Sequence, residues 1–411
     1  GYKVTVLTGI PNYPMGKFFD GYGYRSRRRE QRNGVDIIRI PLIPRGNSGN
    51  RFFNSLGMAA NYLSFVLSGW WWKATTDIRA DLVFTFEVSP MTQALVGVWY
   101  AKKYCIPHFL YVQDLWPENV ETVVGVKNRV VITPINRMVD YIYKHTDQIF
   151  TTSQSFVDAI VNREVGVEKE KVHYWPQYAE EFYKPLDGKE VRKAAEEGSP
   201  VRLIPDDESF KIVFTGNIGT AQGLDILPKA AEKLKDFQIE KKIRFVIVGD
   251  GRYQEAFKKE IRRRNVTESF IMIPRQKPEE IPKLLACCDE AFMSFSDEGL
   301  WEKTIPAKLQ TYMACGMPVI AAAKGETEQV IREAECGICV PIGNVEELVN
   351  GIKELMNLPL REREKLGRNA REYCQKYFHK QILMDRIEIF LSLYLRFDAM
   401  RDDFIEIMEN R

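Results

Sequence analysis

The sequence predicts an α/β protein made of two domains, each built on a parallel sheet. Short apolar strands alternate with helical patterns along nearly the whole chain, an order typical of parallel sheets covered by helices on both faces. The chain has 411 residues, too many for one core of about 150 residues. A charged, turn-rich stretch from Pro185 to Glu208 interrupts the alternation, and we expect it to link the two domains.

The composition excludes several classes of protein. Hydrophobic residues make up 45% and charged residues 28%, which is typical of a globular protein, and a net charge of +2 argues against nucleic-acid binding. The seven cysteines are an odd number and fall mostly in predicted strands and helices, so we expect reduced thiols. Cys336 and Cys339 form a Cys-x-x-Cys, but no second pair or histidine cluster completes a zinc site.

The chain opens directly on an apolar strand, Tyr2 to Thr8, without an initiator methionine or a signal-peptide pattern. We therefore expect further residues ahead of it. The loop from Gly9 to Lys17 is long and rich in turn formers, which is typical of a site loop. Five arginines then fall within eight residues, from Arg25 to Arg32, before a strand from Val35 to Ile40. They form either a solvated strand or loop, or a surface for phosphates or anionic lipid.

Residues Phe52 to Lys73 predict a long helix with a broad apolar face. Asparagines and serines interrupt it, so we do not expect a membrane span. Trp70, Trp71 and Trp72 cannot all face one core, because successive helical residues point about 100° apart. We expect at least one to be exposed, as tryptophan is at the level of lipid headgroups. The alternative is a helix buried on two sides.

Three further strands are predicted in this half, at Leu82 to Phe86, Phe109 to Val112 and Gln148 to Thr152. Ligands of parallel sheets bind beyond the carboxyl ends of the strands. The polar residues at those ends are Glu87, Gln113, Asp114 and Ser153. The carboxylate of Asp114 is either a helix cap or a catalytic group, and we favour catalysis.

A second series of strands occupies the other half of the chain: Lys211 to Thr215, Arg244 to Val248, Phe270 to Ile273, Glu290 to Phe295, Val319 to Ala323 and Ile338 to Val340. Glycines follow the first of them, but they lack the Gly-x-Gly-x-x-Gly spacing, and the chain contains neither a P-loop nor an Asp-x-Asp. The last part, from Leu360, is helical in pattern with a break near His379.

A short helix is predicted after the fourth of these strands, with Pro306 as its first residue and Gly316 just beyond its end. Leu309, Tyr312 and Met313 share its apolar face. Its N-terminus offers free N–H groups and a partial positive charge to a phosphate, and Lys303 and Lys308 add two cations. The alternative is an ordinary β-α-β unit with solvated lysines.

Five separated stretches carry a resemblance to a known family: residues 7–16, 112–118 (Val-Gln-Asp-Leu-Trp-Pro-Glu), 174–183, 214–224 and 304–320. They resemble one branch of the retaining family-4 glycosyltransferases, which have the GT-B fold. This branch is similar to bacterial N-acetyl-L-fucosaminyltransferases and to colanic-acid or capsule transferases.

The resemblance implies a domain order. Residues 1–185 would form an acceptor-binding, membrane-facing domain, 186–208 the linker, 209–378 a nucleotide-sugar domain, and 379–411 a helix returning to the first domain. It also implies that the family's first strand and glycine-bearing loop lie ahead of Gly1.

The resemblance further implies a UDP-sugar donor, carrying an N-acetylated amino sugar or a deoxy amino sugar, and a polyprenyl-diphosphate-linked saccharide acceptor. The anomeric configuration would be retained, with no metal or other cofactor. The protein would work in bacterial surface polysaccharide (capsule or O-antigen) synthesis, attached peripherally to the inner face of the cytoplasmic membrane and without a nucleic-acid partner.

Two departures from the wider family affect the site. The family's Glu-x7-Glu pair is replaced by Lys303 and Thr311, and its diphosphate-binding Arg and Lys by Asn217 and Gln222. The loop with Asn217 and Gln222 thus lacks the family's cations, whereas the facing loop gains one in Lys303. This suggests that a different loop neutralises the charge of the diphosphate here. Gln113 stands where much of the family has a histidine, so Asp114 becomes the expected acid/base group.

The resemblance and the strand ends together give the expected site residues. The catalytic candidates are Asp114, Glu118 and Lys303. The donor site is expected to comprise Gly216, Asn217, Gly219, Gln222, Gly249, Arg275, Thr304, Ile305, Pro306, Lys308, Leu309 and Thr311. The acceptor site is expected to comprise Asn12, Tyr13, Glu87 and Gln113, and the membrane surface Arg25, Arg28, Arg29, Trp70, Trp71 and Trp72.

Two alternatives remain on the same fold. A UDP-sugar 2-epimerase would need histidines and carboxylates in its cleft, yet none of the four histidines follows a strand of the second domain. A non-catalytic nucleotide-sugar-binding protein is compatible with loss of the Glu pair.

Overall fold

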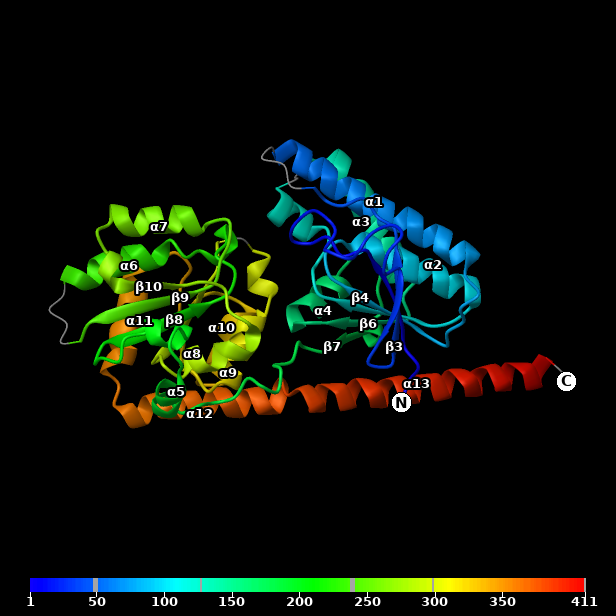
Figure 1. The fold of residues 1–411 in the computed structure, drawn as a ribbon. Coiled ribbons are helices and arrows are strands. Elements are labelled where there is room, and N and C mark those ends of the chain that lie inside the picture. The colour runs from blue at the N-terminus through cyan, green and yellow to red at the C-terminus, as the bar shows by residue number, and fades with distance from the viewer. Residues whose placement is uncertain (47–50, 126–127, 237–240, 298, 410–411) are drawn as a thin grey trace. The chain divides into compact units, whose positions relative to one another are not determined.

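The computed structural model describes residues 1–46, 51–125, 128–236, 241–297 and 299–409 (Figure 1). The chain forms two compact units. The first comprises Gly1–Thr151 and Phe156–Tyr174, and the second comprises Thr152–Ser155 and Trp175–Arg411. Each is built of parallel strands and helices, which confirms the predicted α/β class with two Rossmann-like domains.

The first unit contains two sheets. One has four parallel strands in the order β4-β5-β6-β7: Val83–Glu87, His108–Val112, Gln148–Thr151 and Val172–Tyr174. The other has the order β1-β3-β2: Thr5–Gly9, Val35–Ile40 and Arg29–Arg32, with β2 antiparallel to β3. All of β5 is buried. For the arginine stretch that contains β2, a strand was one of two expected conformations, and the three-residue strand β7 was not predicted.

Helices pack on these sheets and on each other. Helix α1 (Arg51–Thr75) packs on β3 and on α2 (Ala94–Tyr104), which in turn packs on β4 and β5. The two helices are close at Gly69, where an added Cβ would lie 2.5 Å from a methyl carbon of Val96. The other helical segments of the unit are η1 (Met91–Gln93), a π-helical turn η2 (Val120–Val124), α3 (Arg129–Lys144), α4 (Gln154–Val161) and η3 (Lys169–Lys171).

The second unit has one six-stranded parallel sheet in the order β10-β9-β8-β11-β12-β13. The strands are β8 (Phe210–Thr215), β9 (Ile243–Val248), β10 (Phe270–Ile273), β11 (Glu290–Ser294), β12 (Val319–Ala322) and β13 (Gly337–Val340). The chain starts in the middle at β8, builds outward to β10, and returns to β11 on the other side. The carboxyl ends of β8 and β11 therefore flank the topological switch point, where ligands of such sheets bind.

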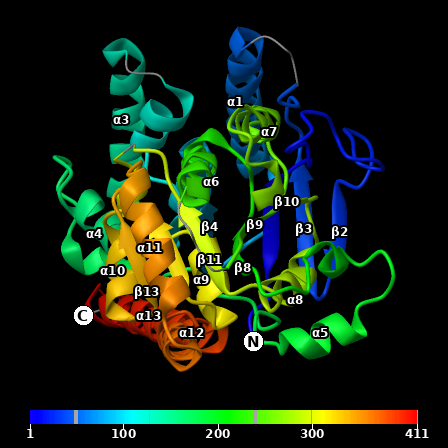
Figure 2. The same ribbon diagram turned by 90° about the vertical axis from the view of Figure 1, so that its left-hand side faces the viewer.

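Helices cover both faces of this sheet (Figures 1 and 2). One face packs against α6 (Ile226–Asp236), α7 (Gln254–Arg263) and α11 (Val345–Asn357). The other packs against α8 (Ile281–Leu285), α9 (Ala307–Ala314), α10 (Glu326–Glu333) and α12 (Leu360–Tyr377). The short 3-10 segments are η4 (Pro200–Leu203), η5 (Thr220–Gln222), η6 (Thr267–Ser269), η7 (Pro278–Glu280) and η8 (Trp301–Lys303).

The stretch expected as a surface linker contributes to the second core. It forms α5 (Gly188–Ala194) and η4, and its Val201 and Ile204 are buried beside α8 and α9. Because Val201 and Ile204 are isolated apolar residues in a charged stretch, the sequence did not indicate that they belong to a core. At the other end, α12 stops before His379 and α13 (Lys380–Glu409) follows, as the predicted break requires.

One carboxyl group lies inside the second core. Glu290, the first residue of β11, is fully buried, and burial raises its pKa well above the usual value. The guanidinium of Arg363 opposes this rise and the charge of Asp289 adds to it.

Candidate active site

Two glycines bring the ends of β8 and β9 together. Gly216 and Gly249 have φ angles of +131° and +146°, and a Cβ at Gly249 would lie 1.9 Å from the carbonyl oxygen of Gly216. The amide of Gly216 donates to the carbonyl of Val248 at 2.9 Å. Only glycine permits this conformation and this approach. Gly216 and Asn217 are consequently exposed beyond the carboxyl end of β8.

The loop after β8 is fixed by the loop after β9. The amide of Ile218 donates to the carbonyl of Asp250 at 2.7 Å, and the amide of Tyr253 donates to the carbonyl of Ile218 at 3.0 Å. A Cβ at Gly251 would lie 2.3 Å from the carbonyl oxygen of Ile218, so the two loops are in contact. This rigid, glycine-rich backbone resembles a cradle for an anion, because its amides are held in place before any ligand binds.

Lys308 from α9 reaches this cradle. Its ammonium donates to Oε1 of Gln222, lies 4.3 Å from the centre of the Phe214 ring, and would be 3.9 Å from a Cβ at Gly216. Burial lowers the pKa of Lys308 to about 7. A bound anion would favour the charged form, so this lysine is suited to hold a phosphate.

Lys303 has a different environment. Its backbone carbonyl accepts a 2.5 Å hydrogen bond from Oγ of Ser153, and the carbonyl of the next residue, Thr304, accepts one from Thr327 at 3.1 Å. Its side chain is half-buried and enters none of the ion pairs found among the described residues. The contacts of the described residues thus link Lys308, and not Lys303, to the glycine loop.

The remaining candidates around α9 divide into core and surface. The side chains of Ile305 and Leu309 are buried in the core, so a contact of either residue with a donor would have to come from its backbone. The hydroxyl of Thr311 donates to the carbonyl of Ala307. The helix starts at Ala307 with Pro306 as its N-cap, one residue later than predicted, and Gly316 has the expected left-handed φ of +68°.

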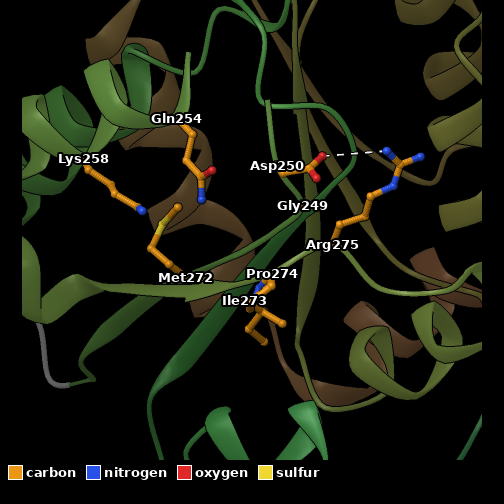
Figure 3. A pocket seen from close by; sticks show the side chains of 8 residues that line it. All are labelled: Gly249, Asp250, Gln254, Lys258, Met272, Ile273, Pro274 and Arg275. Carbon is orange, nitrogen blue, oxygen red and sulfur yellow. Dashed lines mark ion pairs between the residues drawn. The ribbon is translucent and has the colours of Figure 1, made fainter. Parts of the chain in front are cut away.

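An open pocket of about 420 Å³ lies beside the glycine loop, at the carboxyl ends of β9 and β10 (Figure 3). Its lining comprises Gly249, Asp250, Gln254, Lys258, Met272, Ile273, Pro274 and Arg275. The guanidinium of Arg275 lies 3.9 Å from the carboxylate of Asp250. A lining that combines apolar side chains with hydrogen-bonding groups suits a flat heterocycle with hydrogen-bonding edges.

Sequence reasoning found Gly249 and Arg275 but missed Gln254 and Lys258 of this pocket. The two are four residues apart on α7 and therefore share a face. That spacing, directly after the Gly-Asp-Gly turn, was the signal that could have identified them.

In the first unit, Asp114 lies just beyond β5. Its Oδ2 accepts a 2.9 Å hydrogen bond from the amide of Ser89, whose hydroxyl accepts one from the indole of Trp116 at 3.1 Å. The carboxylate is half-buried. Asp114 is therefore an oriented carboxylate at a strand end, and half-buried Gln113 precedes it.

Glu87, at the end of β4, is fully buried. Burial raises its pKa well above the usual value, the charge of Asp114 adds to this, and the amides of Asp114 and Gln113 oppose it. Glu87 is thus a buried carboxyl group near Asp114 whose protonated form is favoured by burial. Since protein covers its carboxyl group, Glu87 cannot contact an acceptor directly, which corrects its placement among the acceptor-binding residues.

Arg163 anchors the segment that carries Asp114 and Glu118. It donates to Asp140 at 2.8 Å, to Asn136 at 2.9 Å and to the carbonyl of Trp116 at 3.5 Å. One carboxylate oxygen of Glu118 is buried and accepts no hydrogen bond from the described residues. The anchoring contacts of Arg163 therefore do not include Glu118.

Asn12 and Tyr13, in the loop that follows β1, have different surroundings. Asn12 is buried, donates to the carbonyl of Ile10 at 3.1 Å and accepts from the amide of Arg45 at 3.3 Å, so it organises the loop. Tyr13 is exposed, and its ring lies 5.0 Å from the guanidinium of Arg45. Sequence reasoning missed Arg45, because nothing in its local pattern indicates what it faces.

The expected membrane residues also divide. Trp70 and Trp71 are 50% and 64% exposed, which confirms that the tryptophan run is not wholly buried, while Trp72 stacks on Tyr100. Arg25 and Arg29 are exposed, but Arg28 donates to the carbonyls of Arg39 and Tyr24. Arg28 therefore has a structural role, which corrects its inclusion in the lipid-facing set.

Comparison with known proteins gives two family matches. Residues 1–177 match the family described as a glycosyl transferase 4-like domain, and residues 197–373 match glycosyl transferases group 1. The chain is also 26% identical over 399 residues to WcaI of Escherichia coli strain K12, a glycosyl transferase provisionally assigned to colanic acid biosynthesis. That match covers 93% of this chain and 89% of WcaI.

Solved structures share the fold at low identity. Sucrose-phosphate synthase from Thermosynechococcus elongatus matches with a TM-score of 0.71 and 17% identity, covering 96% of this chain and 90% of that one. Anabaena Alr3699/HepE in complex with UDP matches with a TM-score of 0.64 and 16% identity, and the match covers 87% of this chain and 86% of that one. WaaG, a glycosyltransferase involved in lipopolysaccharide biosynthesis, matches with a TM-score of 0.60 and 14% identity, and the match covers 88% of each chain.

Proposed function

Because the chain belongs to the GT-B glycosyltransferases, with a 4-like domain followed by a group 1 domain, we propose that it transfers a sugar from a UDP-sugar to a lipid-linked saccharide. The sugar proposed is an N-acetylated amino sugar or a deoxy amino sugar, and the product a bacterial surface polysaccharide. The assignment to polysaccharide synthesis rests on the likeness to WcaI.

The observation that carries the donor proposal is Lys308 beside the glycine loop at the switch point of the second sheet. The adjacent pocket would take the uracil, and the cradle and Lys308 the diphosphate. Anabaena HepE, which shares the fold, has been solved with UDP and with UDP-glucose, which supports a UDP-sugar.

The chemistry proposed here relies on stabilising the leaving group. As the sugar–oxygen bond breaks, charge grows on the diphosphate, and Lys308 with the amides of Asn217 and Gly219 and the N-terminus of α9 would stabilise it. We assign Asp114 to the acceptor hydroxyl as the acid/base group, with the departing phosphate as a second group able to take its proton. For the retained configuration that the family resemblance implies, we propose attack from the leaving-group face, because the loop from Gly216 to Gln222 contains no carboxylate that could act as the nucleophile.

The acceptor side is proposed to meet a membrane surface. Among the described residues, no helix has the length and apolarity of a membrane span. Exposed Leu63, Leu67, Trp70 and Trp71 on α1 support peripheral attachment, and exposed Arg25 and Arg29 would add attraction to anionic lipid.

The test is a transfer assay combined with calorimetry across UDP-, GDP- and dTDP-sugars. The wild type should bind UDP-sugars and transfer the sugar to a lipid-linked acceptor. Asp114→Asn should abolish transfer yet keep UDP affinity within a few-fold, because Asp114 belongs to the first unit and the donor pocket to the second.

Retained turnover in Asp114→Asn would remove Asp114 from the catalytic role. Binding of UDP-sugars without hydrolysis or transfer by the wild type would favour the non-catalytic alternative instead.

A further inference from the structure

A loop of the first unit, from Leu42 to Gly46, is fixed in place by two buried amides. Asn61 of α1 donates to the carbonyl of Ile43 at 2.6 Å, and Asn12 accepts from the amide of Arg45 at 3.3 Å. The amide of Gly46 donates to the carbonyl of Gly16 at 2.9 Å. Both asparagines are buried, so the loop is part of a built structure rather than a free surface segment.

Helix α1 closes directly over this loop. At Gly57, an added Cβ would lie 2.1 Å from the carbonyl oxygen of Arg45, so a larger residue would push the helix away. Gly57 therefore sets the distance between α1 and the backbone of Arg45. The position of the Arg45 side chain follows from this contact.

The guanidinium of Arg45 lies between two tyrosine rings. Its central carbon is 5.0 Å from the ring centre of Tyr13 and 5.3 Å from that of Tyr62, which is on α1. Among the described residues, no carboxylate lies within ion-pair distance of it. Cation–π contacts hold the guanidinium while leaving its N–H edge able to bind an oxyanion in a bidentate manner.

Asp114 belongs to the same neighbourhood. Burial raises the pKa of Tyr62, the guanidinium of Arg45 lowers it, and the charge of Asp114 raises it. Both charged groups therefore lie near one phenol, but no ion pair joins them. An arginine that is not neutralised by the nearby catalytic carboxylate remains available to a ligand.

The two segments that carry Tyr13 and Tyr62 also expose apolar side chains. Leu56 and Leu63 are seven residues apart and share one face of α1, where both are largely exposed, and Met15 in the loop after β1 is exposed as well. An anion with an apolar tail could bind the guanidinium through its charge and pack against these apolar side chains through its tail. A free sugar has neither the charge nor the tail.

We propose that Arg45, held between Tyr13 and Tyr62, binds the phosphate ester that joins the acceptor saccharide to its lipid. This inference rests on the proposed function and names a part of its acceptor site. Arg45 would place the first sugar of the acceptor next to Asp114, while the apolar surface of α1 would take the start of the lipid chain.

The experiment measures binding of farnesyl diphosphate, a short polyprenyl diphosphate, by calorimetry on the full chain. Arg45→Gln should weaken binding about 10–100-fold, the range expected for charge-assisted contacts. The affinity of Arg45→Lys for farnesyl diphosphate should lie between those of the wild type and Arg45→Gln, because an ammonium keeps the charge but lacks the planar donor pair. Arg79→Gln is the matched control, since Arg79 also stacks on a tyrosine, Tyr104, at 4.1 Å, and it should bind as the wild type does.

Two further probes separate the possible sources of phosphate. Inorganic pyrophosphate should bind much more weakly than farnesyl diphosphate, and Arg45→Gln should leave binding to phosphatidylglycerol vesicles unchanged. Equal binding of farnesyl diphosphate by Arg45→Gln and wild type, equal affinity of pyrophosphate, or loss of vesicle binding alone would each overturn the proposal.

Calorimetry with UDP-glucose completes the design. All variants should bind it as the wild type does, which shows that they are folded. Failure of the wild type to bind UDP-glucose would count against the proposed function, whereas failure to bind farnesyl diphosphate would count against the role of Arg45.

Discussion

Lys308 couples donor binding to pH. Its ammonium lies at the glycine loop, in contact with Gln222 and Phe214, and its pKa is lowered to about 7 by burial. Below pH 7 the side chain is charged before any ligand arrives. Above pH 7 a proton must be taken up when an anion binds, which lowers the apparent affinity.

UDP-glucose affinity of the wild type should therefore fall as the pH rises from 6 to 8.5, because its diphosphate keeps the same charge over this range while Lys308 loses its own. Lys308→Met should bind UDP-glucose about 10–100-fold more weakly at pH 6, with little dependence on pH. Calorimetry at several pH values measures both effects.

Lys303→Met is the matched comparison. An equal loss of UDP-glucose affinity in Lys303→Met and Lys308→Met would show that both lysines reach the diphosphate, as predicted from the sequence. A loss in Lys308→Met alone would assign the charge to α9, and unchanged affinity in Lys308→Met would contradict the relocation of charge from the loop after β8.

The sequence predicted residues at strand ends better than residues that act through tertiary contacts. Gly216, Gly249 and Asp114 lie at the strand ends where they were expected, because an apolar strand followed by glycine or a carboxylate is a local pattern. Arg45 was missed because its significance depends on Tyr62, which lies on the next helix. Glu87 was misplaced because the sequence does not show that neighbouring segments cover it.

At the scale of elements, α1 presents an unusual apolar face. Leu63, Leu67 and Trp70 follow one another at intervals of four and three residues, so they form one stripe, and Trp71 lies beside it. Asn61, Val66 and Gly69 form the buried side. The helix thus covers the unit with one side and leaves large apolar side chains on the other.

A Trp70→Ser, Trp71→Ser double variant should bind phosphatidylglycerol vesicles at least several-fold more weakly than the wild type in co-sedimentation, and high salt should weaken binding of both. Trp72→Ser provides the contrast. Trp72 stacks on Tyr100, so its loss should lower the melting temperature and affect vesicle binding less. Unchanged co-sedimentation of a folded double variant would exclude the tryptophans as membrane contacts.

Elements with strong local signals were predicted closely, and weak ones were not. The strand at Val35–Ile40 has the predicted bounds. Strand β7 was not predicted, since it has only three residues, and the arginine stretch that contains β2 was left open between a strand and a loop. Their conformation is determined by pairing with β3 and β6 rather than by their own residues.

For the whole molecule, the two-unit architecture was predictable because the β-α-β alternation occurs twice. The order of strands within each sheet was not, since strands that are neighbours in space are distant in the sequence. The sequence likewise gave no sign that β1 to β3 form a sheet separate from β4 to β7.

The buried carboxyl groups make folding of this chain a proton-uptake reaction. Glu87 in the first unit and Glu290 in the second both have a raised pKa, so the native state keeps protons that the unfolded chain releases above about pH 4.5. By linkage, the free energy of unfolding should fall as the pH rises, by up to about 1.4 kcal/mol per pH unit for each group that remains protonated. Taken by themselves, these two carboxyl groups stabilise the folded chain more in mild acid than in mild alkali, whereas the lowered pKa of Lys308 contributes in the opposite direction above pH 7.

Glu290→Gln isolates this effect, because glutamine has the shape of the neutral acid but takes up no proton. Urea unfolding at pH 6 and pH 8 should show a smaller loss of stability between the two values in the variant than in the wild type. An equal loss in both proteins would mean that Glu290 stores no proton. With the smaller loss, acidification would act on this protein as a stabilising ligand does, with the proton as the ligand and a carboxyl group inside the sheet as its binding site.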